Sequence, residues 1–232
     1  ADVTFADGAD IITASAGTSN FRAGVNAGNS IASGGNYNTV VGDEAGTAIT
    51  TGVRNVLLGY AAGDSLTDAD YNVAVGYDSL AIDTLGSKAV ALGYAALSTQ
   101  NFTSATDNFN TAVGFAAGSS VSTGINNTLI GGLAGDALTD ADSNVAIGYN
   151  SMSSSVLGSQ SVAVGSGALF SMNPASAVNM LNTAVGYDAG NAITTGTDNT
   201  IVGGLAGDAS TTGAGNTFIG KEAGTSNTTG GD

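Results

Sequence analysis

Short apolar runs recur along the chain, and a glycine closes each of them. The recurring unit reads Asn-x-apolar-apolar-Gly, as in residues 55–59 (NVLLG) and 144–148 (NVAIG), and we number its positions from the Asn. Positions 2 to 4 are rich in Val, Ile and Thr, which is typical of short β-strands ended by a turn. The glycine of position 5 occurs at Gly24, Gly42, Gly59, Gly76, Gly93, Gly114, Gly131, Gly148, Gly165, Gly186, Gly203 and Gly220.

Most of these glycines are 17 positions apart, as from Gly42 to Gly59, and the exceptions are one interval of 18 and two of 21. A longer repeat lies over this period, because AGDSLTDAD at 62–70 returns as AGDALTDAD at 134–142, an offset of 72 positions. Such regular periods indicate a stacked repeat architecture. No linker interrupts the series, so we predict one continuous array over residues 20–232, preceded by a lead-in segment over residues 1–19.

Each unit has two turn points, because a second glycine recurs at position 15, for example at Gly52 and Gly124. Glycine inside a helix costs about 1 kcal/mol relative to Ala, and collagen needs glycine at every third residue, so the pattern favours neither structure. We predict an all-β fold, a parallel β-solenoid of twelve turns with one repeat unit in each turn. Stacked turns rise by about 4.8 Å each.

Side chains alternate between the two faces of a strand, so positions 2 and 4 point one way and position 3 the other. Position 4 is Val, Leu or Ile in eleven units, as at Val75 and Ile147, and we expect it to face the interior. Position 3 is apolar as well, as at Leu57 and Ala74, and would then form an exposed stripe. Because such stripes usually mark interfaces, we predict a homo-oligomer.

The Asn of position 1 is present in ten of the twelve units. Identical side chains stacked in register can form an amide ladder, in which each turn satisfies the next. We therefore predict a structural Asn ladder along the rod, with a polar ligand-binding row as the alternative.

The composition excludes several classes of function. The chain has no Cys and no His, so thiolate chemistry, Ser-His-Asp catalysis and the common zinc sites are excluded. Four basic residues face nineteen acidic ones, for a formal net charge of −15, so we expect no binding to nucleic acid. No run approaches the roughly 18 apolar residues of a membrane helix, so we expect no membrane insertion.

Several units resemble the repeats of known surface fibres. Residues 110–118 (NTAVGFAAG) and 182–190 (NTAVGYDAG) resemble the head repeats of trimeric autotransporter adhesins of the YadA type, and resemble more closely the NTAVG-type repeats of marine bacteriophage tail fibres. The resemblance covers residues 20–232 and implies a left-handed β-roll in a homotrimer. It also implies an extracellular place, on a virion or a cell surface, and contact with a glycan or protein receptor. Neither the adhesins' membrane anchor nor the self-cleaving chaperone domain that often ends such phage fibres is in this sequence. A cleaved or partial fibre would explain both, so the tail fibre is the favoured interpretation.

Aromatic residues are the candidates for receptor binding, because exposed rings can stack on sugar faces. One set lies at position 6, directly after the glycine: Tyr60, Tyr77, Tyr94, Tyr149 and Tyr187. A second set lies in or beside the two four-residue insertions: Phe102, Phe109 and Phe170. Loops that leave a rigid repeat often carry its recognition surface. The alternative is that these rings shield the glycine corners or pack between chains.

Recurring acidic corners raise the question of calcium. The pattern D-x-x-x-D-x-D occurs at Asp64, Asp68 and Asp70, and again at Asp136, Asp140 and Asp142. Calcium takes six to eight oxygen ligands, which such a loop can supply in part. The known calcium-loop signatures are absent, so we favour solvated corners and expect no cofactor, with Ca²⁺ as the open alternative.

Three functions remain compatible with a solenoid. The favoured one is a non-enzymatic fibre segment that presents a receptor-binding surface. An ice-binding solenoid would need a persistent Thr array, but Val replaces Thr at position 2 in five units, as at Val56 and Val145. A depolymerase would need two carboxylates about 5–9.5 Å apart in a groove, and no Asp or Glu pair stands out.

Overall fold

The computed structural model describes residues 15–230 and contains strands but no helix in that range. Twelve three-residue strands form one long sheet. These are β1 (Phe21–Ala23), β2 (Thr39–Val41), β3 (Val56–Leu58), β4 (Val73–Val75), β6 (Val90–Leu92), β8 (Thr111–Val113), β9 (Thr128–Ile130), β10 (Val145–Ile147), β12 (Val162–Val164), β14 (Thr183–Val185), β15 (Thr200–Val202) and β16 (Thr217–Ile219).

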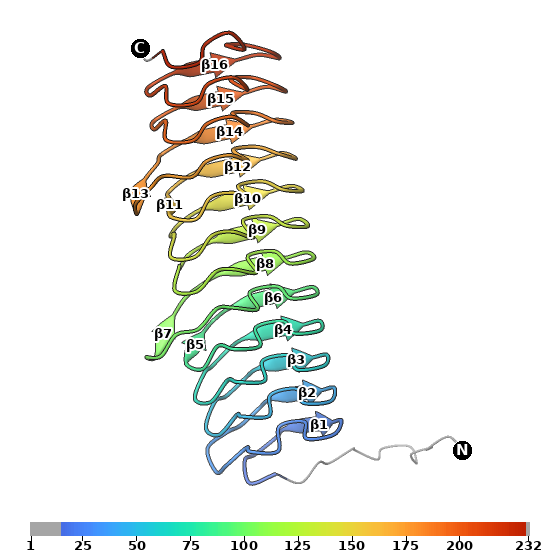
Figure 1. Cartoon of the computed structure of the whole chain (residues 1–232). Helices are drawn as coiled ribbons and strands as arrows, with labels where there is room; N and C mark the ends of the chain where they lie inside the picture. Colours follow the sequence, from blue (N-terminus) through green and yellow to red (C-terminus); the bar gives the residue numbers. More distant parts are fainter. Residues whose placement is uncertain (1–14, 231–232) are drawn as a thin grey trace, which may run out of the picture.

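The strands stack along the rod in sequence order, one strand for each turn (Figure 1). Every pair is parallel, and equivalent positions lie side by side, as where Val145 pairs with both Thr128 and Val162. The predicted parallel β-solenoid of twelve turns is therefore confirmed. Most of the predicted lead-in segment, residues 1–14, lies outside the described residues.

The two longer turns form small sheets of their own on the side of the rod away from the long sheet (Figure 1). In the first, β5 (Gly86–Ser87) pairs with β7 (Thr106–Asp107). In the second, β11 (Gly158–Ser159) pairs with β13 (Val178–Asn179). The insertions thus extend the solenoid locally and leave the register of the long sheet unchanged.

The predicted assignment of strand faces is wrong. Position 3 faces the interior, because Leu57, Ala74 and their counterparts from Val40 to Ile201 are fully buried. Position 4 faces outward together with position 2, and Ile130 and Val185 are each 37% exposed. The alternation itself is correct, but the coil interior is too narrow for a large side chain in every turn, and position 3 is often Ala. The exposed aliphatic column is therefore position 4.

The interior is filled by turns of two complementary types. In one turn Leu57 and Leu66 fill the core, and an added Cβ at Gly63 would lie only 2.8 Å from each of them. In the next turn Leu80 replaces that glycine, and the strand residue shrinks to Ala74. Because protein interiors are close-packed, the volume gained at one position is lost at the other.

The Asn ladder is confirmed, and its bonds run mainly from side chain to backbone. The Asn127 Oδ1 accepts the Asn144 N–H at 3.0 Å, and the Asn127 Nδ2 donates to the Ala141 carbonyl oxygen at 2.8 Å. The ten Asn side chains of this column are buried, at 8% exposure or less. The column therefore joins each turn to the next and ties each turn's strand to its second corner.

Replacing Asn127 with Ala is expected to lower the free energy of unfolding by about 2–4 kcal/mol, because it leaves the Asn144 N–H and the Ala141 carbonyl buried without partners. The control is Asn173→Ala, since the Asn173 side chain is exposed and lies outside the ladder, and this change is expected to stay within about 0.5 kcal/mol. Urea unfolding followed by circular dichroism measures both. Equal losses for the two variants would contradict a ladder that holds the turns together.

Candidate functional site

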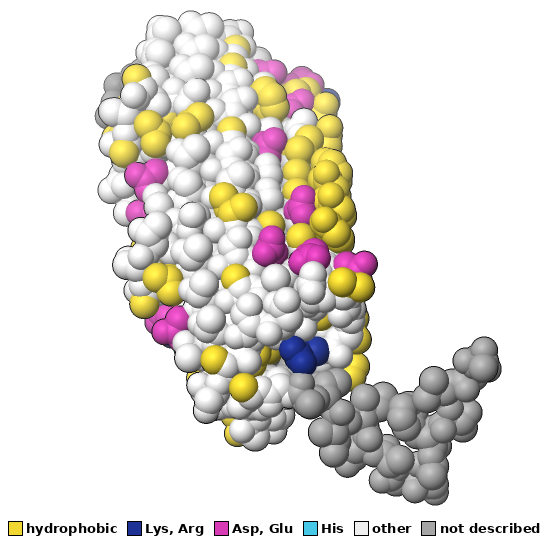
Figure 2. Space-filling view, turned by 60° about the horizontal axis from the view of Figure 1, so that its bottom comes forward, with side chains coloured by type: hydrophobic (Ala, Val, Ile, Leu, Met, Phe, Trp, Pro, Cys, Tyr) yellow, Lys and Arg dark blue, Asp and Glu magenta, His cyan; other side chains and the backbone are white. Residues whose placement is uncertain are grey.

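An exposed aromatic column runs along the carboxyl ends of the strands of the long sheet, where an aromatic residue follows the glycine corner in six of the twelve turns. The rings of Tyr60, Tyr77, Tyr94 and Phe115 stack face to face, with centroids 5.1, 5.5 and 5.1 Å apart and interplanar angles of 8–17°. These four rings are 48–59% exposed. Figure 2 shows hydrophobic side chains gathered in a band along one edge of the rod, with acidic side chains among them. The sequence predicted the column, and the structure adds that its first part is a continuous stack.

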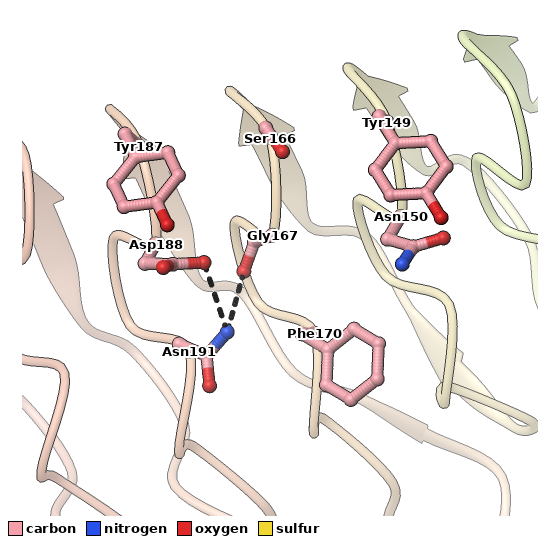
Figure 3. A pocket seen from close by; sticks show the side chains of 8 residues that line it. All are labelled: Tyr149, Asn150, Ser166, Gly167, Phe170, Tyr187, Asp188 and Asn191. Carbon is pink, nitrogen blue, oxygen red and sulfur yellow. Dashed lines mark hydrogen bonds between the residues drawn. The ribbon is translucent and has the colours of Figure 1, made fainter.

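The second part of the column is interrupted. Position 6 is Gly132 in the turn after Phe115 and Ser166 in the turn between Tyr149 and Tyr187. The interruption at Ser166 opens a cleft of about 270 Å³ between the two tyrosines. Tyr149 and Tyr187 stand on either side of it, and Phe170 lies below them (Figure 3).

Polar groups line the end of the cleft near Tyr187. The Asn191 Nδ2 donates to the Asp188 Oδ1 at 3.1 Å and to the Gly167 carbonyl oxygen at 3.2 Å (Figure 3). Asp188 fits there because position 167 is glycine, where an added Cβ would lie 2.0 Å from the Asp188 Oδ1. A hydrogen bond to Asp188, and then its negative charge, raise the pKa of the Tyr187 phenol. The carboxylate is thus held beside an exposed ring.

The opposite end of the cleft is formed by Tyr149 and Asn150. The Asn150 Oδ1 is buried and has no hydrogen-bond partner among residues 15–230. Ser166 lies between the two ends, on the strand side (Figure 3). The cleft therefore combines three aromatic surfaces with a carboxylate, a hydroxyl and two amides, and none of its lining residues is basic.

The three predicted Phe residues have three different surroundings. Phe102 is only 6% exposed and packs beneath the first insertion, so it offers no surface to a receptor. Phe109 is 54% exposed, and the Lys88 ammonium lies 5.2 Å from its ring centroid. Phe170 is the one that the structure brings together with two predicted tyrosines, at the cleft.

A second exposed column, formed by the residue just before position 1, was not predicted from the sequence. The Arg54 guanidinium lies between two rings, 5.2 Å from the centroid of Tyr37 and 5.3 Å from that of Tyr71. Lys88 continues this alternation of cations and rings toward Phe109 and forms an ion pair with Asp107. Contacts between a cation and a ring contribute about 0.5–1 kcal/mol at exposed sites. The column thus engages two of the chain's four basic side chains.

The acidic corners join neighbouring turns. The Asp68 Oδ1 accepts the Thr51 hydroxyl at 2.6 Å, and the Asp70 Oδ1 accepts the Val53 N–H at 2.7 Å. Burial, and then the charges of Glu44 and Asp78, raise the pKa of Asp64. In the second copy the donors to Asp136, Asp140 and Asp142 are the Ser153 hydroxyl, the Thr123 hydroxyl and the Ile125 N–H. Within residues 15–230 no group of three or more acidic side chains is placed to hold a metal ion.

The first insertion is fixed from inside by a buried carboxylate. Asp83 is fully buried and accepts hydrogen bonds from the Gln100 Nε2 at 2.6 Å and from the Gly86 and Phe102 N–H groups at 3.0 Å. Burial raises the pKa of Asp83, although these hydrogen bonds oppose the shift. The equivalent positions of the second insertion hold Ser155, Met172 and Pro174. The second insertion therefore lacks the buried carboxylate, and it also lacks two of the three groups that donate to this carboxylate in the first insertion, the Gln100 side chain and the Phe102 N–H.

Replacing Asp83 with Ala is expected to lower the free energy of unfolding by about 2–4 kcal/mol, because three buried donors lose their acceptor. The triple variant Asp83→Ser/Gln100→Met/Phe102→Pro, which copies the second insertion, is expected to recover most of that loss. Denaturant unfolding of both variants measures the difference. If the triple variant is as unstable as the single one, the two insertions are not interchangeable in this way.

The difference in the free energy of unfolding between the unmodified chain and the triple variant is expected to depend on pH. Because the pKa of Asp83 is higher in the folded chain than in the unfolded chain, the folded state binds its proton more tightly. The stability of the unmodified chain relative to the triple variant is therefore expected to rise as the pH falls from 7 through the folded pKa. Unfolding midpoints across this range measure the trend, and a relative stability that falls with acidification would contradict it.

No protein-family model, curated protein or solved structure matches the chain. Its class is therefore defined by its own geometry, which is that of a repeat protein with a parallel β-solenoid fold. Residues 15–230 contain no helix with the length and apolar character needed to cross a bilayer.

Proposed function

We propose that the chain is a non-enzymatic segment of a homotrimeric extracellular fibre that presents a receptor-binding surface. The observation that carries the proposal is the outer face of the long sheet. Positions 2 and 4 of successive turns project from it in register, and residues such as Val56, Ile130 and Val202 stay 37% exposed in the single chain. An apolar face that follows a whole rod favours self-association.

The resemblance of the NTAVG-type units to tail fibres and adhesins suggests three chains in the oligomer and a place in one of these two kinds of protein. Of the two, a bacteriophage tail fibre is the first choice and a bacterial trimeric adhesin head the second. The exposed aromatic column, in which Tyr60, Tyr77 and Tyr187 are 48–61% exposed, supplies rings of the kind that contact sugar faces. It supports a glycan or protein receptor as partner.

Binding to cell surfaces tests this function. Fluorescently labelled chain is incubated with a panel of bacteria and with their purified capsular polysaccharides and lipopolysaccharides. The proposal predicts saturable binding to at least one surface, with no release of reducing ends from the bound polysaccharide. No saturable binding to any surface would contradict the adhesive function, and release of reducing ends would show a depolymerase.

The outer sheet face also keeps an ice-binding function as a second candidate. Six of its position-2 residues are Thr, and the strands repeat them at a regular spacing, as at Thr183 and Thr200. This function needs the face to be free in solution, whereas the fibre needs it to be covered by other copies. Thermal hysteresis of the purified chain separates the two, because a face buried between subunits is not available to ice.

A further inference from the structure

The cleft beside Ser166 has the height of one missing ring. In the first copy of the 72-residue repeat, Tyr94 stands at the position of Ser166 and lies between Tyr77 and Phe115, 5.5 Å from one ring centroid and 5.1 Å from the other. Tyr149 and Tyr187 are also separated by two turns, a rise of about 10 Å, but the turn between them carries Ser166. The space between these two rings therefore has about the height of the one ring that is missing from the column.

The residues that line the cleft differ together between the two copies of the 72-residue repeat. Seven of its eight residues differ from the residue 72 positions earlier, and only Tyr149 keeps its counterpart, Tyr77. The changes are Asp78 to Asn150, Tyr94 to Ser166, Ala95 to Gly167, Ser98 to Phe170, Phe115 to Tyr187, Ala116 to Asp188 and Ser119 to Asn191. One change removes a ring, one adds an apolar floor, and three add a carboxylate and two amides.

Two of these changes depend on each other. Asp188 leans over position 167, and any side chain there would displace it, because a Cβ on Gly167 would lie 2.0 Å from the Asp188 Oδ1. Asn191 then holds the carboxylate in place at 3.1 Å. Loss of the Tyr94 ring alone would have left a shallow gap. The additional changes give the gap a fixed acceptor at one end and the Asn150 amide at the other.

We propose that this slot binds one neutral pyranose ring of a surface glycan. The rings of Tyr149 and Tyr187 flank the slot and offer apolar surface to the C–H groups of the sugar, and Phe170 closes the bottom of the slot. The Asp188 carboxylate accepts from adjacent sugar hydroxyls, and the Ser166 hydroxyl can donate or accept. The Asn191 Nδ2 already donates to Asp188 and Gly167, so its Oδ1 is left to accept, and the Asn150 Oδ1 is buried, so its Nδ2 is left to donate. A volume near 270 Å³ is just below the usual range of ligand pockets, about 300–1,000 Å³, and suits a single ring.

The charge of the site selects among sugars. Asp188 is the only ionisable group of the lining besides the two phenols, and the chain as a whole carries a formal charge of −15. An anionic uronate or sialic acid would meet this carboxylate without a basic partner. A neutral hexose replaces its bound water with hydrogen bonds to the same groups. This inference rests on the proposed surface-binding function and names its ligand class.

The test uses the full chain and the methyl pyranosides of glucose, mannose and galactose as probes. Saturation-transfer NMR and titration of Tyr fluorescence are expected to give a Kd of about 1 mM for at least one of them. Ser166→Tyr restores the missing ring and is expected to weaken binding at least tenfold. The matched control, Gly132→Tyr, fills the other interruption of the column and is expected to leave binding unchanged.

A second variant covers the case in which Ser166→Tyr fails to fold. Asp188→Ala installs the residue found at the equivalent Ala116 and is also expected to weaken binding at least tenfold. Binding of none of the three pyranosides, or equal binding by the unmodified chain and Ser166→Tyr, would overturn the proposal. A change of oligomeric mass in Ser166→Tyr would overturn it as well, because the slot would then hold a side chain of another copy.

The outcome is independent of the cell-binding experiment. A chain that binds cells but no pyranoside retains the proposed function and loses the slot. A chain that binds a pyranoside through Ser166 but no cell surface retains the slot and loses the fibre function.

Discussion

Replacing Ile130 and Ile147 together with Asp is expected to convert the proposed trimer to a monomer without loss of the solenoid. The two side chains are neighbours at position 4 of β9 and β10, in the middle of the outer sheet face. A charge buried in an apolar interface costs several kcal/mol, so two of them should weaken association by at least about a thousandfold. Light scattering after size-exclusion chromatography measures the mass, and circular dichroism checks the fold.

The matched control places the same charges on another surface. Ile82 and Val178 are exposed aliphatic residues, at 46% and 40%, and neither lies on the outer sheet face. Ile82→Asp/Val178→Asp is expected to keep the mass of the proposed trimer. If both double variants dissociate, net charge and not the sheet face controls assembly. If neither dissociates, the face is not the interface.

Replacing Gly131 with Ala is expected to lower the free energy of unfolding by at least about 3 kcal/mol, because Gly131 has a φ of +136°, a region that L-residues rarely adopt. An added Cβ would also lie 2.6 Å from the Gly148 carbonyl oxygen of the next turn. Because each turn contacts only its neighbours, a displaced corner weakens the array on both sides of it. The glycine corners are therefore expected to be the least substitutable positions of the rod.

The adjacent glycine supplies the control. A Cβ on Gly132 would meet only the Tyr149 ring, at 3.6 Å, which is ordinary van der Waals contact. Gly132→Ala is therefore expected to stay within about 0.5 kcal/mol of the unmodified chain. Denaturant unfolding at a single protein concentration compares the two, since the stability of an oligomer depends on concentration. Equal stability of the two variants would contradict backbone-to-backbone packing at the corners.

Much of the fold follows from the sequence because its interactions repeat. The regular glycine period predicted one strand for each turn, and the column of Asn predicted a ladder that the Asn127 hydrogen bonds confirm. Which strand face is buried did not follow from hydrophobicity alone, since positions 3 and 4 are both apolar. The side-chain sizes at positions 3 and 9 of the unit compensate each other, which marks both positions as interior. Ala74 at position 3 goes with Leu80 at position 9, and Leu57 at position 3 goes with Gly63 at position 9.

The candidate site was predicted in part. The sequence predicted the column of tyrosines, but it did not distinguish Phe102, which is buried, from Phe170, which lines the cleft. Asp188 and Asn191 were missed because they look like ordinary polar corner residues. Comparison of the two copies of the longer repeat would have found them, since the differences gather at one place around Ser166. Their contact across turns depends on the coil geometry, which the sequence does not display.

The mass of the unmodified chain in solution shows whether three copies associate. Sedimentation equilibrium at micromolar concentration is expected to give three times the chain mass of 22.3 kDa. That result would support the homotrimeric fibre, and the Ile130→Asp/Ile147→Asp variant would then show whether the outer sheet face forms the interface. A stable species of 22.3 kDa across the concentration range would contradict the homotrimeric fibre and leave the face free for another function.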